Sequence, residues 1–170
     1  MKTKDFLKKH DACIDGAKWA LSISEEMADV WDAMIEQVKH EWLLWTATRL
    51  DVFTDSVLRK LACRFVRETP LHDGRTVWDL LTDERSRKAV EVAEAYADGK
   101  ATAQELDAAR DAAYDAYAAA RDAYYTATRD AAKAAQVQMI AEMGNPFKKE
   151  RESNENQRLF DKAQCLSRRR

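Results

Sequence analysis

His10 and Cys13 are the two residues whose types and spacing come nearest to a chemical site in this chain. A histidine can accept the proton of a nearby thiol, and the thiolate that results is both a nucleophile and a metal ligand. No supporting acid and no sequence signature of a cysteine enzyme accompanies this pair. The other histidines, His40 and His72, lack the HExxH, HxH or His/Cys spacing that places two metal ligands on one face. We therefore expect no enzymatic activity, no metal and no cofactor.

Paired carboxylates are the second group that could hold a metal. A metal site between helices would call for a Glu-x-x-His signature, which the sequence does not contain. Four glycines are also too few to build a phosphate-binding loop easily. We therefore do not expect a metal at these pairs, which are Glu25 with Glu26, Asp83 with Glu84, and Asp111 with Asp115.

Tyrosine and arginine gather in an alanine-rich stretch between Arg110 and Gln136. These two residue types dominate the energetics of protein interfaces. We expect the exposed side of a helix here to contact a partner protein, although the same tyrosines could instead pack inward. The candidate partner-binding residues are Tyr114, Tyr117, Arg121, Tyr124 and Tyr125.

The end of the chain is basic, whereas the rest is acidic. Residues 147–170 hold eight Lys/Arg and four Asp/Glu, which leaves 20 Lys/Arg against 26 Asp/Glu, a net charge of −6, elsewhere. The terminal residues Arg168, Arg169 and Arg170 could contact nucleic acid or an acidic partner, or could simply increase solubility. The sequence leaves both readings open.

Composition predicts an all-α protein. The 170 residues include only four glycines and two prolines, and 34% of them are charged, which suits helices better than sandwiches or barrels. No apolar run approaches the roughly 18 residues of a membrane span, and the first residues lead into no signal-peptide hydrophobic region. We expect a cytoplasmic protein without membrane contact. Its three cysteines, Cys13, Cys63 and Cys165, are expected to be reduced and mostly buried.

Local signals place the helices of the first hundred residues. We expect a turn at Asp15–Gly16, and a capping box from Ser22 to Glu25 that opens one helix over residues 23–40. Residues 41–50 are apolar almost all round and predict a helix buried on several sides. Thr54 or Asp55 should cap a helix that stops at Thr69–Pro70. Thr82 should cap the next helix, which ends at Gly99.

The alanine-rich stretch opens with a second capping box, Thr102 to Glu105. An unbroken helix over residues 103–143 would span about 60 Å, more than the diameter of a compact domain of this size. We expect it to bend or break near residues 124–126, or to pair with a second copy or with residues 147–166. The stripe expected to form its packing seam is Ala109, Ala113, Ala116, Ala120, Ala123, Ala127, Ala131 and Ala134.

The predicted architecture is a globular helical bundle with a long alanine-rich helix that is bent or packed as a helical hairpin or coiled coil. Residues 1–100 form the globular helical half. Residues 101–146 form the alanine-rich helix, which packs on that half or on a second copy in a homodimer. Residues 147–170 form a basic C-terminal helix or tail.

Three segments resemble immunity proteins carried by phages and bacteria: residues 6–16 with Trp19, residues 31–33 followed by 41–50, and residues 85–113. The family proline expected near Ser86 is missing, and the tail after Pro146 lies outside the resembling part. The resemblance implies a helical, non-enzymatic protein of a phage or mobile element that neutralises a host or rival protein by binding it. The alternative is a nucleic-acid-associated or structural phage protein that acts through the basic tail.

Overall fold

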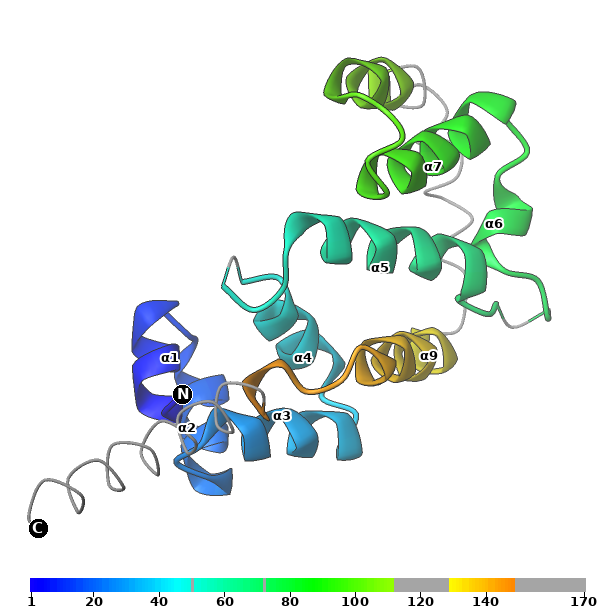
Figure 1. Ribbon diagram of the computed structural model, residues 1–170. Coiled ribbons are helices and arrows are strands. Elements are labelled where there is room, and N and C mark those ends of the chain that lie inside the picture. The colour runs from blue at the N-terminus through cyan, green and yellow to red at the C-terminus, as the bar shows by residue number, and fades with distance from the viewer. Residues whose placement is uncertain (50, 72, 112–128, 149–170) are drawn as a thin grey trace, which may run out of the picture. The chain divides into compact units, whose positions relative to one another are not determined.

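The computed structural model describes residues 1–49, 51–71, 73–111 and 129–148, and within these ranges the regular structure is helical (Figure 1). Two isolated β-bridges, Lys2 with Glu26 and Pro70 with Thr76, join segments of these ranges that otherwise contain no strand. The all-α class is therefore confirmed. The longest helices bounded within the described ranges have 14 residues, and no long continuous helix or coiled coil is evident there.

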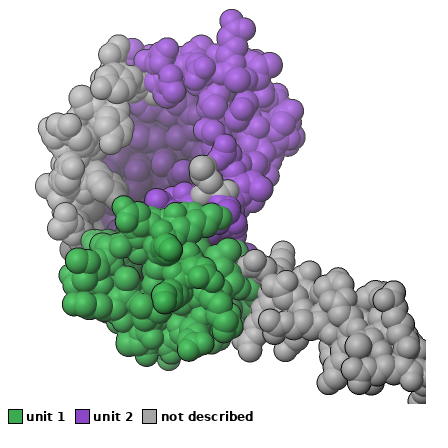
Figure 2. Space-filling view, turned by 90° about the vertical axis from the view of Figure 1, so that its left-hand side faces the viewer, with its two compact units in different colours: residues 1–43, 144–170 green, residues 44–143 purple. Residues whose placement is uncertain are grey.

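The chain divides into two compact units (Figure 2). The first consists of residues 1–43 and 144–170, and the second of residues 44–143. The beginning and the end of the chain therefore belong to the same unit. The segment boundaries predicted at residues 100 and 146 remain predictions. In the described part of either unit, no helix combines the length and the apolar character needed to cross a bilayer.

The first unit contains three helices that contact one another: α1 (Thr3–Lys9), α2 (Ile14–Ile23) and α3 (Met27–Glu36). Helix α3 has the clearest core face, because Met27, Val30, Trp31 and Met34 follow helical spacing and are all buried. Phe6 of α1 is fully buried as well. This small core gathers two large aromatic side chains among aliphatic and methionine side chains.

The C-terminal segment completes this core. Phe147 is buried, and its ring centroid lies 5.4 Å from that of Phe6 and 5.9 Å from that of Trp31. Asn145 donates from Nδ2 to the carbonyl oxygen of Ala28 at 2.7 Å and to the Asp32 carboxylate at 2.8 Å. Nothing in the local pattern around Pro146 indicates this docking, which depends on contacts with residues at the opposite end of the chain.

Two expected features of the first unit are wrong in detail. Asp15 and Gly16 are not a turn but the first turn of α2, whose N-terminus is capped by the Cys13 Sγ atom accepting from the Gly16 amide at 3.4 Å. Ser22 does not open a helix, because its hydroxyl donates to the Trp19 carbonyl oxygen at 2.7 Å and the residue stays inside α2. Ser24 caps the end of α2 instead, and its Oγ accepts from the Glu26 amide.

The helix expected over residues 23–40 is shorter at both ends, because Ile23 still belongs to α2 and α3 begins only at Met27. Helix α3 ends at Glu36, Val38 has a positive φ of 52°, and α4 (His40–Ala47) begins two residues later. Within α4, Leu43, Thr46 and Ala47 are buried, whereas its two tryptophans are partly exposed. The burial expected for residues 41–50 is therefore confirmed on one side only.

Helix α5 (Asp55–Glu68) organises the second unit. It contacts α6 (Val77–Leu80), α7 (Glu84–Ala97) and α9 (Arg129–Glu142), and Figure 1 shows it between α7 and α9. Thr54 caps it by accepting from the Val57 amide at 3.4 Å, and it ends before Thr69–Pro70, as expected. Asp83 rather than Thr82 caps α7, and Gly99 has the positive φ expected after its end.

The alanine-rich stretch is described at its two ends. The predicted capping box is confirmed, because the Thr102 amide donates to the Glu105 carboxylate at 2.7 Å and the Glu105 amide donates to the Thr102 hydroxyl at 3.2 Å. It opens helical residues that are described up to residue 111. Helix α9 covers the other end. Most of the predicted alanine seam lies in residues 112–128, outside the described residues.

Candidate functional site

The predicted partner-binding residues cannot be placed. Tyr114, Tyr117, Arg121, Tyr124 and Tyr125 lie outside the described residues, and so do Arg168, Arg169 and Arg170. What the structure describes is the chain on either side of residues 112–128, and on the C-terminal side how it docks on α5. The described residues on both sides of this gap, up to Met143, belong to the second unit.

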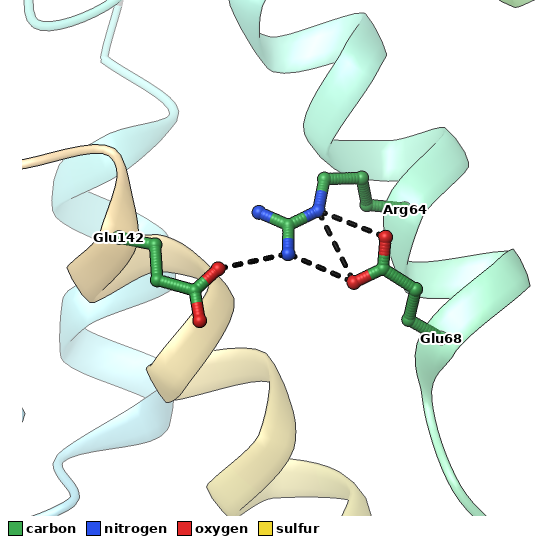
Figure 3. A network of polar contacts seen from close by, with 3 residues as sticks. All are labelled: Arg64, Glu68 and Glu142. Atoms are coloured by element: carbon green, nitrogen blue, oxygen red, sulfur yellow. Dashed lines mark hydrogen bonds and ion pairs between the residues drawn. The ribbon is translucent and has the colours of Figure 1, made fainter.

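Helix α9 is fixed to α5 by polar contacts at two places. Arg64 of α5 binds two carboxylates at once: its Nη2 atom lies 2.8 Å from Glu68 on its own helix and 2.9 Å from Glu142 near the end of α9 (Figure 3). Hydrogen bonds from the guanidinium hold the pKa of Glu68 below its usual value. This network joins the C-terminal end of the alanine-rich stretch to the centre of the unit.

The second contact is made by Gln136, the last residue of the predicted binding surface. Gln136 was expected at the border of an exposed contact face, but it is buried and its Nε2 atom lies 3.5 Å from the Thr69 hydroxyl, to which it donates. Gln136 therefore helps to dock α9 on α5. Arg110, at the other border, is exposed and lies 3.6 Å from both Asp107 and Asp111.

The alanine seam faces away from the core on α9, whereas Ala109, at its other end, is half-buried. Ala131 and Ala134 are exposed, whereas Ala132, Val137 and Ile140 are buried. Within α9 the larger side chains on the opposite face pack inward instead, because they remove more apolar area from water. Packing of the alanine stripe on a second copy stays a prediction.

The candidate chemical pair at the N-terminus has structural roles. The Cys13 side chain is exposed, which contradicts the expectation of mostly buried thiols, and it caps α2. The His10 ring packs on Phe6, with centroids 4.6 Å apart. Cys63 is buried as expected, and burial raises the pKa of its thiol, with the Glu94 charge acting in the same direction. Cys165 lies outside the described residues.

Several of the paired carboxylates act as caps or ion-pair partners. Asp83 caps α7 and also contacts the Arg85 guanidinium at 2.7 Å, and Lys2 lies 2.7 Å from Glu26. In the described ranges no three His, Cys, Asp or Glu side chains come together in a way that could hold a metal ion. Asp115 lies outside these ranges.

Sequence reasoning missed a stacked cluster in the second unit. The Arg67 guanidinium lies 4.0 Å from the centroid of the Trp78 ring and makes two hydrogen bonds to the Glu94 carboxylate, at 2.5 and 2.7 Å. The guanidinium carbon of Arg87 lies 5.5 Å from the centroid of the same ring. One indole therefore links α6 to α5 and α7 through cation–π contacts. The sequence places Trp78 in a helix but gives no signal for its partners.

A surface of the first unit was also missed. Trp19 of α2 and Trp42 of α4 pack together with ring centroids 5.1 Å apart, and the Lys39 ammonium lies 5.7 and 5.4 Å from the two rings. Both tryptophans are partly exposed. On the outer side of α2, Ile14 is 72% exposed and Leu21 50% exposed. Exposed apolar and aromatic side chains of this kind are typical of contact surfaces.

Comparison with known proteins adds no assignment: no family model, no curated protein and no solved structure matches this chain.

Proposed function

We propose that this protein is a non-enzymatic binding protein of a phage or mobile element, which inhibits or neutralises a host or rival protein by occupying its surface. The observation that carries the proposal is the exposed apolar stripe of α2. Ile14 and Leu21 are seven positions apart, which places them on one side of the helix, and both are at least half exposed. A lone exposed aliphatic side chain is ordinary, but two on one stripe favour a contact surface.

The resemblance of three sequence segments to immunity proteins of phages and bacteria supports the same proposal. It also favours action in the cytoplasm of the host cell. The roles found for the candidate chemical residues agree with a binding protein, since Cys13 caps a helix and His10 packs on Phe6. The Cys13 and His10 side chains therefore contribute to the fold through these two contacts.

Within this proposal, Tyr114, Tyr117, Arg121, Tyr124 and Tyr125 form a second part of the partner surface. Support comes from the chain on either side of them: residues 103–111 begin at a confirmed capping box, and α9 is docked on α5. We further propose that the alanine-rich stretch bends as a hairpin or pairs with a second copy, for which the exposed Ala131 and Ala134 leave room.

The test is affinity capture of the full chain from a bacterial lysate, with and without nuclease, read out by mass spectrometry. One stoichiometric protein partner that survives nuclease is expected. Capture should weaken in Tyr117→Ala and Arg121→Ala while circular dichroism shows unchanged helicity. Capture that disappears with nuclease would contradict the proposal. It would favour binding of nucleic acid through the basic tail, which should then depend steeply on salt and on Arg168, Arg169 and Arg170.

A further inference from the structure

Val38 ends helix α3 in a backbone motif that ordinarily requires glycine. The Lys39 amide donates to the Met34 carbonyl oxygen at 2.8 Å, and the Val38 amide donates to the Ile35 carbonyl oxygen at 3.1 Å. These two bonds define the Schellman motif, in which the residue at the Val38 position is left-handed and is usually glycine. Val38 has a φ of 52°.

The same motif ends α7 with the usual residue. There the Lys100 amide donates to Ala95 and the Gly99 amide donates to Tyr96, and Gly99 has a φ of 73°. A β-branched residue in this conformation is strained, because its branched Cβ crowds the backbone. The end of α3 therefore holds strain that the end of α7 avoids.

Packing inside the protein does not compensate for this strain. The Val38 side chain is 50% exposed, so folding removes only part of its apolar surface from water. Backbone strain of this kind clusters at active sites, ligand clamps and switch regions, which makes a strained residue a candidate for a functional contact. Val38 is thus both strained and available on the surface.

Lys39 directly follows Val38 in the chain and contacts the aromatic pair of the first unit. Its ammonium lies over Trp19 and Trp42, at 5.7 and 5.4 Å from the ring centroids. Within the part of the chain that the structure describes, Lys39 forms cation–π contacts but no ion pair with a carboxylate. A carboxylate supplied from outside would complement this charge.

We propose that Val38, Lys39, Trp19 and Trp42, named here the α3–α4 corner, form an interaction surface for a partner protein segment that is apolar and acidic. The segment places apolar side chains against Val38 and the indoles, and a carboxylate against the Lys39 ammonium. This inference rests on the proposed protein-binding function and specifies one surface and its chemistry. It is independent of residues 112–128.

The test uses the full-length protein and a phage-displayed library of random 16-residue peptides as the probe. We expect enriched peptides that combine aliphatic or aromatic residues with Asp or Glu. Their synthetic versions should bind Val38→Gly and Lys39→Gln about tenfold more weakly than the wild type, which corresponds to the loss of one good contact. Val38→Gly should also unfold at a higher denaturant concentration, so weaker binding cannot be attributed to a less stable fold.

Two further variants make the test specific. Val57→Ala removes another exposed aliphatic side chain, in the second unit, and should leave peptide affinity unchanged. Glu36→Gln removes an exposed negative charge from the last turn of α3 and should strengthen the binding of acidic peptides.

The outcomes separate this inference from the proposed function. No enrichment, enrichment of peptides without acidic residues, or equal binding to Val38→Gly would overturn the α3–α4 corner as a surface. If a lysate protein is nevertheless captured equally by wild type and Val38→Gly, protein binding stands and its surface lies elsewhere. If capture fails while peptides bind in the expected way, the proposed function fails and the corner stands as a peptide-binding surface.

Discussion

Phe147 meets Phe6 edge to face, with ring centroids 5.4 Å apart and an angle of 85° between the ring planes. This contact joins the two ends of the chain inside one core, and both side chains are almost completely buried. Edge-to-face pairs of this kind add specific attraction to the area that they bury. The last helical residues before position 149 are therefore part of the first unit rather than an accessory to it.

Phe147→Ala should lower the free energy of unfolding by about 3–5 kcal/mol, because it leaves a cavity between Phe6 and Trp31. Urea denaturation followed by tryptophan fluorescence measures this change. The neighbouring Lys148→Ala is the matched control. It removes an exposed ion pair with Asp32 and should cost less than about 1 kcal/mol. Equal effects of the two substitutions would show that Phe147 is not a core residue.

Val38→Gly should raise the free energy of unfolding by up to about 1 kcal/mol. Relief of left-handed strain exceeds the entropy that glycine adds to the unfolded chain. Gly99→Ala is the converse control and should lower it by about 1 kcal/mol. A Cβ at position 99 would meet no atom within 4 Å, so this cost comes from the backbone alone. Chemical denaturation measures both changes, and a less stable Val38→Gly would refute the strain at the end of α3.

Cys63 should be protected from alkylation in the folded protein. Its side chain is buried, and burial together with the Glu94 charge raises the pKa of the thiol, so little thiolate is present at neutral pH. Iodoacetamide labelling followed by peptide mass spectrometry should modify the exposed Cys13 first and Cys63 only after denaturant is added. The Cys165→Ser variant simplifies the readout. Labelling of Cys63 as fast as Cys13 would contradict the burial.

The pKa of the Glu68 carboxyl should lie below the ordinary glutamate value of about 4.3. Hydrogen bonding from Arg64 lowers its folded-state pKa, so its contribution to stability is present above the unfolded pKa and is lost as the pH falls through the folded value. Because both side chains are more than a third exposed, this contribution is below about 1 kcal/mol.

Carbon-detected NMR titration measures the Glu68 pKa directly. Arg64→Gln should return it toward the ordinary value, whereas Arg85→Gln, which removes a cation bound to Asp83, should leave it unchanged. A Glu68 pKa that does not respond to Arg64→Gln would exclude the contact shown in Figure 3.

The sequence alone determined the all-α class and several helix ends. The scarcity of glycine and proline excludes folds with many turns. The ends at Thr54, at Thr69–Pro70 and at the Thr102–Glu105 box were predictable, because a cap is made between residues no more than about four positions apart. Gly99 was predictable for the same reason, since the left-handed position after a helix favours glycine.

Tertiary structure decided the features that involve distant residues. The left-handed backbone at Val38 has no local signal, because its residue type disfavours the conformation that the fold imposes. The burial of Gln136 and the exposure of Ala131 and Ala134 follow from how α9 docks on α5, and Phe147 is buried by residues from the start of the chain. Local patterns record hydrogen bonds within a turn, whereas these outcomes depend on which apolar surfaces from separate segments exclude water together.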